Sequence, residues 1–209
     1  TLDPRQIRWD RLHYDRHYLN YEILMHICRF VLEGWLQTTE RGQHYMMTFL
    51  DDQMPKVYEK FILEYYRRHR VELGLTEVRA KEIPWDVSDG SDWGMNQILP
   101  KMRTDITLCK EDKVLIIDAK YYTQILSSHY ERQMARSSHL YQMYAYVNNL
   151  DTCHTGNVAG LLLYAKTKDE ENLNSHVEIG GHRFAIRTLD LNQPFEGIKV
   201  QLNHVAATI

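Results

Sequence analysis

Cysteine is scarce in this sequence. Cys28, Cys109 and Cys153 stand far apart and form neither a CxxC pair nor the even set that a disulfide framework needs. The sequence therefore gives no sign of a disulfide-stapled secreted domain, and a reducing, cytoplasmic setting is the simplest expectation.

Long apolar runs and charge of a single sign are missing too. No apolar stretch approaches the length of a membrane span, so no membrane partner is expected. The 25 basic and 28 acidic residues sum to −3, which argues against a polycation that coats nucleic acid but leaves room for a local basic groove. The chain starts at Thr1 without a charged and then apolar leader, which suggests a fragment of a longer protein and no signal peptide.

Helices are predicted where apolar residues recur at helical spacing. This spacing occurs over 14–36, over 53–72, and from Ser137 or Ser138 onwards through Val147. We expect residues 1–52 to form a helical N-terminal segment and residues 53–209 to form the main domain.

Strands are predicted at five places. β-rich runs at 102–109 and 113–119 form one hairpin, 159–164 is a buried strand, and 176–179 and 183–189 flank a Gly-Gly turn. Residues 123–136 look irregular. The order of these elements predicts an α/β fold, with a mixed central β-sheet flanked by helices and preceded by a helical segment.

The register of the first hairpin carries the chemical argument. A turn centred on Glu111 and Asp112 sets Lys110 opposite Lys113, and counting back along the strands sets Asp105 opposite Asp118. Like charges in that position destabilise a strand pair. Apolar residues on both faces of these strands also predict that the sheet is covered on both sides. A half-buried carboxylate pair must then share a proton or hold a cation.

Two interpretations of these residues stay open. Oxygen ligands at this spacing suit Mg²⁺, and Lys120 projects from the same face as Asp118, where its ammonium can act on a water or a phosphate. The alternative is an ordinary surface salt bridge among solvated residues at a strand end, because a short D-x-K pattern occurs often by chance.

Several segments resemble a known nuclease family. Residues 104–107 (TDIT) and 116–122 (IIDAKYY) resemble the PD-(D/E)xK motif, with Thr104 where that family often has Pro. More closely, 99–106 (LPKMRTDI), 117–122 (IDAKYY) and 140–146 (LYQMYAY) are similar to the McrC nuclease subunits of McrBC-type modification-dependent restriction systems. The similarity extends weakly to 57–61 and 160–164, and so covers most of the chain.

This resemblance implies a restriction-endonuclease-like fold and a set of site residues. It makes Asp105 and Asp118 the ligands of a Mg²⁺ ion, for which Mn²⁺ substitutes, and makes Lys120 the catalytic lysine. It also suggests a further metal ligand on the helix before the hairpin. Glu59 is preferred there to Glu64, because Glu59 flanks the apolar stripe and Glu64 points away from it, although both suit a solvated helix surface.

Gln142 is the remaining candidate. It matches a glutamine on the helix that follows the hairpin in related nucleases, where that residue approaches the active site. The alternative is that Gln142 is simply a polar residue beside the apolar stripe of its helix.

The resemblance implies a metal-dependent DNA endonuclease subunit that hydrolyses phosphodiester bonds in DNA containing modified cytosine, such as 5-methylcytosine. The partners it implies are an AAA+ GTPase of McrB type and a second nuclease subunit for double-strand cleavage. The family's N-terminal region, which engages that GTPase, is expected to lie largely outside this sequence. Two alternatives remain: a PD-(D/E)xK nuclease of another defence or repair pathway, or a non-catalytic module that couples to a motor.

Overall fold

The computed structural model describes residues 40–87, 98–121, 126–129, 132–135, 137–166 and 172–209. The chain divides into two compact units, Thr1–Val57 and Tyr58–Ile209, and the fold given below is that of the second unit. The helix predicted at 14–36 lies outside the described residues. The domain boundary expected after residue 52 falls within helix α2, Glu40–Arg68, which begins earlier and ends earlier than the predicted helix at 53–72.

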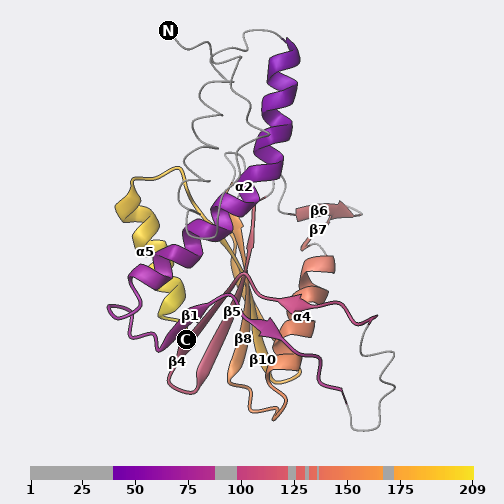
Figure 1. The fold of residues 1–209 in the computed structure, drawn as a ribbon, viewed down its shortest axis with the longest axis vertical. Coiled ribbons are helices and arrows are strands. Elements are labelled where there is room, and N and C mark those ends of the chain that lie inside the picture. The colour runs from indigo at the N-terminus through magenta and orange to yellow at the C-terminus, as the bar shows by residue number, and fades with distance from the viewer. Residues whose placement is uncertain (1–39, 88–97, 122–125, 130–131, 136, 167–171) are drawn as a thin grey trace. The chain divides into compact units, whose positions relative to one another are not determined.

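A six-stranded mixed sheet forms the centre of the second unit (Figure 1). The strand order is β1-β4-β5-β8-β10-β9, in which β5, β8 and β10 run parallel and the other pairs are antiparallel. The strands are β1 Glu77–Arg79, β4 Ile106–Lys110, β5 Lys113–Lys120, β8 Val158–Ala165, β9 Asn174–Ile179 and β10 His182–Leu189.

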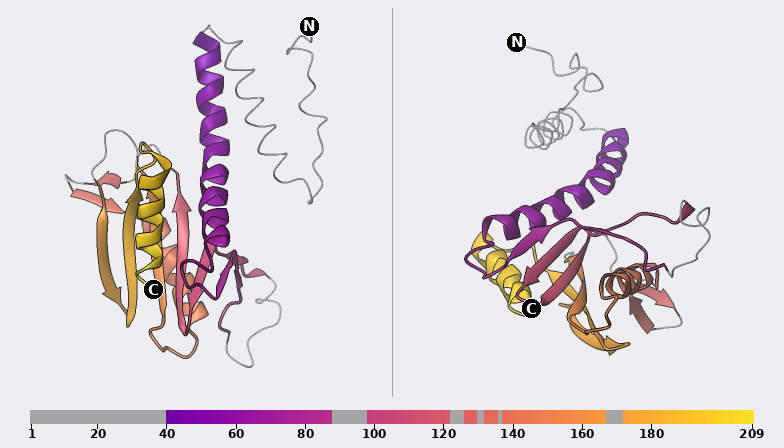
Figure 2. Two further views of the ribbon diagram at one scale, coloured as in Figure 1. Left: turned by 90° about the vertical axis from the view of Figure 1, so that its left-hand side faces the viewer. Right: turned by 60° about the horizontal axis from the view of Figure 1, so that its bottom comes forward.

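Helices cover both faces of this sheet. Helix α4, Ser137–Leu150, lies in the crossover from β5 to β8, and α5, Phe195–Ala206, follows β10. Figure 2 shows α4 and α5 on opposite sides of the sheet. A mixed sheet flanked by helices is therefore confirmed. None of the helices in the described parts of the chain is long and apolar enough to cross a membrane.

Two separate cores explain why β5 is apolar on both of its faces. On one face, Ile117 packs with Ile62 of α2 and Leu202 of α5. On the other face, Ile116 packs with Met143 and neighbouring residues of α4. Parallel strands need such cover on both sides, because either bare face would expose apolar side chains to water.

Two predicted segments differ from the structure. The strand expected at 102–109 is split, because β3, Met102–Arg103, pairs with β2, Glu82–Ile83, before the chain enters β4 in the main sheet. The segment expected to be irregular contains a small hairpin of β6, Leu126–His129, and β7, Arg132–Ala135. Its two strands form a separate two-stranded sheet, and their sequences, LSSH and RQMA, lack the apolar run that marks a core strand.

Helix α5 was not predicted. Its signal was present in Pro194 at the N-cap and in the helical spacing of Ile198, Leu202 and Val205. Strands β1 and β2 were also missed, since two or three residues are too few to show an alternating pattern.

Candidate active site

The hairpin of β4 and β5 has the register that was predicted. Lys110 pairs with Lys113 and the ladder continues to Ile106 opposite Ile117. Glu111 takes a positive φ of 54° in the turn. Asp105 comes directly before the first residue of β4, so it lies next to Asp118 at the end of the ladder rather than within it.

The chain is held firmly where it passes from β3 to β4. The hydroxyl of Thr104, a residue that is 1% exposed, accepts the backbone N–H of Lys81 at 2.9 Å and contacts the Thr107 hydroxyl at 2.9 Å. Asp105 follows, and its Oδ2 accepts the backbone N–H of Ala119 at 2.9 Å. Thr104 thus anchors the backbone, and Asp105 reaches across to β5.

Asp118 and Lys120 form a nearly buried ion pair. Lys120 Nζ lies 2.7 Å from Asp118 Oδ2, and the two side chains are 14% and 4% exposed respectively. Among the described residues this oxygen accepts no hydrogen bond with good geometry, so its partner is the charge of Lys120. Burial of this kind distinguishes the pair from a solvated surface salt bridge.

Helix α4 contributes two side chains to the same cluster. Gln142 Oε1 accepts a long hydrogen bond from Lys120 Nζ at 3.4 Å, and Gln142 Nε2 donates to the Tyr146 hydroxyl at 2.9 Å. Gln142 therefore does approach the pair, as the resemblance implied. Tyr146 was not among the predicted residues, although its position four residues after Gln142 puts both on one side of the helix.

The two glutamates of α2 differ in their surroundings. Glu64 is exposed and pairs with Lys60 at 3.1 Å and Arg67 at 2.8 Å, as a solvated helix residue does. Glu59 is half-buried and close enough to Asp105 to raise its pKa. The structure therefore brings Glu59, and not Glu64, towards the carboxylate pair.

Negative charge is in excess at this cluster. Burial, followed by repulsion from Asp118 and Glu59, raises the pKa of Asp105 from 3.8 to about 7. The N–H of Ala119 and the charge of Lys120 oppose this rise without cancelling it. Three carboxylates lie near one ammonium, so a further cation bound there would relieve the repulsion between the carboxylates.

The donor set fits a hard divalent cation held mainly by two carboxylates. Within the described ranges no three His, Cys, Asp or Glu side chains are grouped closely enough to form a metal site by themselves. Mg²⁺ is usually bound through one or two carboxylates, together with water and substrate phosphate, so Asp105 and Asp118 suffice for it. Glu59 would then contribute mainly through its charge.

The fold and this cluster define an α/β protein with an acidic residue and a lysine, Asp118 and Lys120, at the end of a parallel strand and a second acidic residue, Asp105, directly before the neighbouring strand. Residues 3–165 match the family model described as "McrBC 5-methylcytosine restriction system component". The chain belongs to this family.

One curated protein and one solved structure are similar to this chain over most of its length. The "Type IV methyl-directed restriction enzyme EcoKMcrBC" of Escherichia coli (strain K12) is 30% identical over 184 residues, which are 87% of this chain and 51% of that protein. A chain in an assembly of Thermococcus gammatolerans McrB AAA+ hexamers with bound McrC is 16% identical, with a TM-score of 0.49, and the match covers 75% of this chain and 33% of that one. The chain thus spans about half the length of the curated relative that it matches.

Proposed function

We propose that this chain carries the nuclease centre of a modification-dependent restriction system and hydrolyses phosphodiester bonds in DNA with the help of Mg²⁺. The observation that supports this most directly is the burial of Asp118 against Lys120, at 2.7 Å, beside Asp105. A protein with a purely structural role would gain no stability from a second acidic side chain in that place. Clusters of charged groups with perturbed pKa values are typical of functional sites.

Asp105 and Asp118 would hold the ion, with the charge of Glu59 close by. When bound, the ion would polarise a scissile phosphate and neutralise charge on it. The N–H of Ala119 fixes the carboxylate of Asp105, so that this ligand is oriented before any ion or substrate arrives.

Lys120 would supply the second part of the chemistry. Its ammonium lies between Asp118 and Gln142, and Tyr146 fixes Gln142 in turn. A cation held in this way orients an attacking water and stabilises the negative charge that develops on the phosphate. Gln142 and Tyr146 act as positioning residues for Lys120.

The family's description supports DNA with 5-methylcytosine as the substrate. The GTP-driven AAA+ partner of McrB type and the second nuclease subunit for double-strand cleavage belong to the same proposal. They follow from the resemblance of the motif segments, and this chain is about half as long as its curated relative.

The first test compares Lys120→Met with Lys113→Met. Both lysines are on β5, but Lys113 is exposed at the opposite end of the strand. We expect Lys120→Met to slow Mg²⁺-dependent cleavage of modified DNA, assayed with the GTPase partner and GTP, by about 100-fold or more. Lys113→Met should cleave like the parent. Equal cleavage by the two variants would contradict the role given to Lys120.

A second test measures metal binding without the partner. Calorimetric titration with Mn²⁺ should detect binding in the parent and in Asp112→Asn, a change in the exposed turn of the same hairpin. Binding should vanish in Asp118→Asn. A folded parent that binds no Mn²⁺, even with DNA present, would favour the non-catalytic module that couples to a motor.

A further inference from the structure

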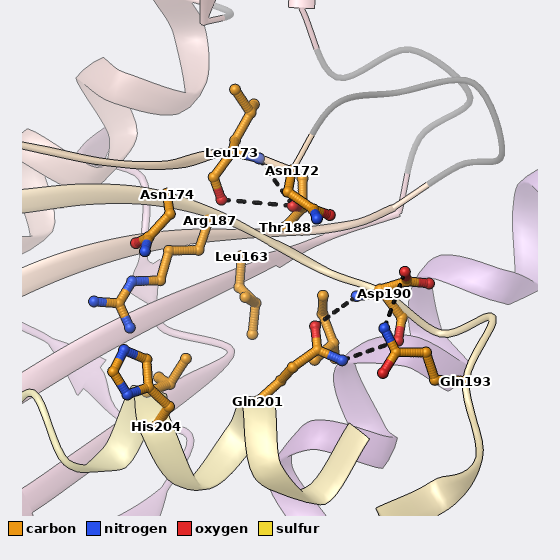
Figure 3. Close-up of a pocket in the computed structure, with 12 residues that line it drawn as sticks. Leu163, Asn172, Leu173, Asn174, Arg187, Thr188, Asp190, Gln193, Gln201 and His204 are labelled. Atoms are coloured by element: carbon orange, nitrogen blue, oxygen red, sulfur yellow. Dashed lines mark hydrogen bonds between the residues drawn. The ribbon is translucent and has the colours of Figure 1, made fainter. Parts of the chain in front are cut away.

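A cavity of about 300 Å³ lies between strand β10 and helix α5 (Figure 3). Leu163 of β8 lines it and pairs in the sheet with Ala119, and both belong to the core on the α2 and α5 side. Asp118 and Lys120 alternate with Ala119 along β5, so they project from the opposite face. The cavity is therefore distinct from the acidic cluster.

Arg187 of β10 places a guanidinium in this cavity that none of the described carboxylates pairs with. Its Nε and Nη1 atoms are buried and have no hydrogen-bond partner among the described residues. Burial, together with the nearby charge of Arg183, lowers the pKa of the guanidinium. Buried donors of a charged group are normally paired, so these atoms mark the place of an acceptor.

His204 of α5 lines the same part of the cavity. Figure 3 shows its ring and the guanidinium of Arg187 pointing towards one another, with the amide of Asn174 near them. A guanidinium offers only donors, and an imidazole and an amide can each present an N–H beside it. Such a set suits an oxyanion.

The acidic residue of the cavity is already paired. Asp190 lies at the other end in Figure 3, where it accepts hydrogen bonds from Gln193 and the Asn192 N–H and lies 3.5 Å from Lys166. The hydrogen bond from Gln193, followed by that from Asn192, lowers the pKa of Asp190. Its charge is thus balanced locally and does not neutralise Arg187.

We infer that this cavity is a binding site for a phosphate-type oxyanion, held by Arg187 and His204. Leu163, Leu189 and Val205 form an apolar floor that can take the organic part of a phosphate ester. The volume is at the lower end of the range for ligand pockets, which fits a mononucleotide-sized group. The anion is either a free phosphate compound or a phosphate of the DNA backbone. The site does not depend on the nuclease activity proposed above.

Calorimetry with inorganic phosphate, in EDTA so that no divalent ion contributes, tests this inference. We expect the parent to bind and Arg187→Gln to bind at least tenfold more weakly. His204→Gln should also bind more weakly, and because His204 is exposed this change leaves folding intact. Arg183→Gln is the matched control, since it removes a nearby exposed charge of the same strand that does not line the cavity, and its affinity should fall far less than that of Arg187→Gln.

A parallel titration with a short unmodified DNA duplex distinguishes the two sources of the anion. Loss of DNA affinity in Arg187→Gln but not in Arg183→Gln supports a site for the DNA backbone. Loss of phosphate binding with unchanged DNA binding supports a site for a free phosphate compound. The inference is overturned if the parent binds neither probe, or if both cavity variants bind them as the parent does.

Discussion

Replacing Asp105 by asparagine should make the metal-free protein more stable at neutral and alkaline pH. An unfolded chain ionises an aspartate near pH 4, whereas burial and the charges of Asp118 and Glu59 keep Asp105 protonated up to about pH 7 in the folded protein. The folded state therefore loses stability as the pH rises from about 4 to about 7. A pKa difference of about three units corresponds to about 4 kcal/mol once both states are ionised.

Asparagine has nearly the shape of aspartate, cannot ionise, and still offers an oxygen to the N–H of Ala119. At pH 8 in EDTA we expect Asp105→Asn to raise the free energy of unfolding by about 2 to 4 kcal/mol. For a chain of this size that raises the melting temperature by roughly 5 to 15 °C. Near pH 4 the difference should vanish, because Asp105 is then largely protonated in the folded state.

The assay is thermal or urea unfolding at several pH values between 4 and 8, first in EDTA and then with Mn²⁺. Glu64→Gln is the control, because Glu64 forms only exposed pairs with Lys60 and Arg67. It should change stability by less than about 1 kcal/mol. Mn²⁺ should stabilise the parent and leave Asp105→Asn unaffected. A variant that is no more stable than the parent at pH 8, or a difference that does not change with pH, would refute this account of the acidic cluster.

Two further predictions concern the support around the site. Gly160→Ala should lower the free energy of unfolding by about 1 to 3 kcal/mol in urea titrations, because its Cβ would come within 2.6 Å of Met143 Cγ on α4. Asp151→Ala should destabilise the loop before β8 by about 1 to 3 kcal/mol, seen as faster hydrogen exchange, since Asp151 accepts the N–H groups of Thr155 and Gly156. Burial alone would raise the pKa of Asp151, but these hydrogen bonds lower it, so the stabilisation should fade as the pH falls below about 4.

The sequence was sufficient to predict the hairpin and its register. Turn residues and a two-residue repeat are local features, and the spacing of Asp118 and Lys120 follows from that repeat alone. The sequence did not show that Asp105 precedes the strand, because the change of sheet at Thr104 depends on Lys81, which lies far away in the chain. The sequence favoured Glu59 over Glu64 from the apolar stripe of the helix alone, but both residues also suited a solvated surface, and only the packing of α2 shows Glu59 near Asp105.

Other parts of the molecule depend on contacts between distant segments, which the sequence does not show. The cavity at Arg187 exists only because α5 packs beside β10, and α5 itself was missed. The role of Gln142 was left open for the same reason, since its contact with Lys120 joins α4 to β5 across the end of the sheet. Local spacing thus predicts helices, strands and the face on which a residue lies. Which residues from distant segments contact each other can be seen only in the folded structure.

The position of the acidic cluster follows from the topology of the sheet. Strand β5 is covered by two cores, so an acid within it is desolvated and must find a cation. At its C-terminal end β5 runs parallel to β8, with Lys120 opposite Tyr164. In open α/β sheets the crevice beyond the carboxyl ends of parallel strands is where ligands bind. Asp118 and Lys120 lie where β5 leaves the core. Asp118 is held by the packing around it, and Lys120, the last residue of the strand, is the more exposed of the two and lies where the proposed ion and phosphate would bind.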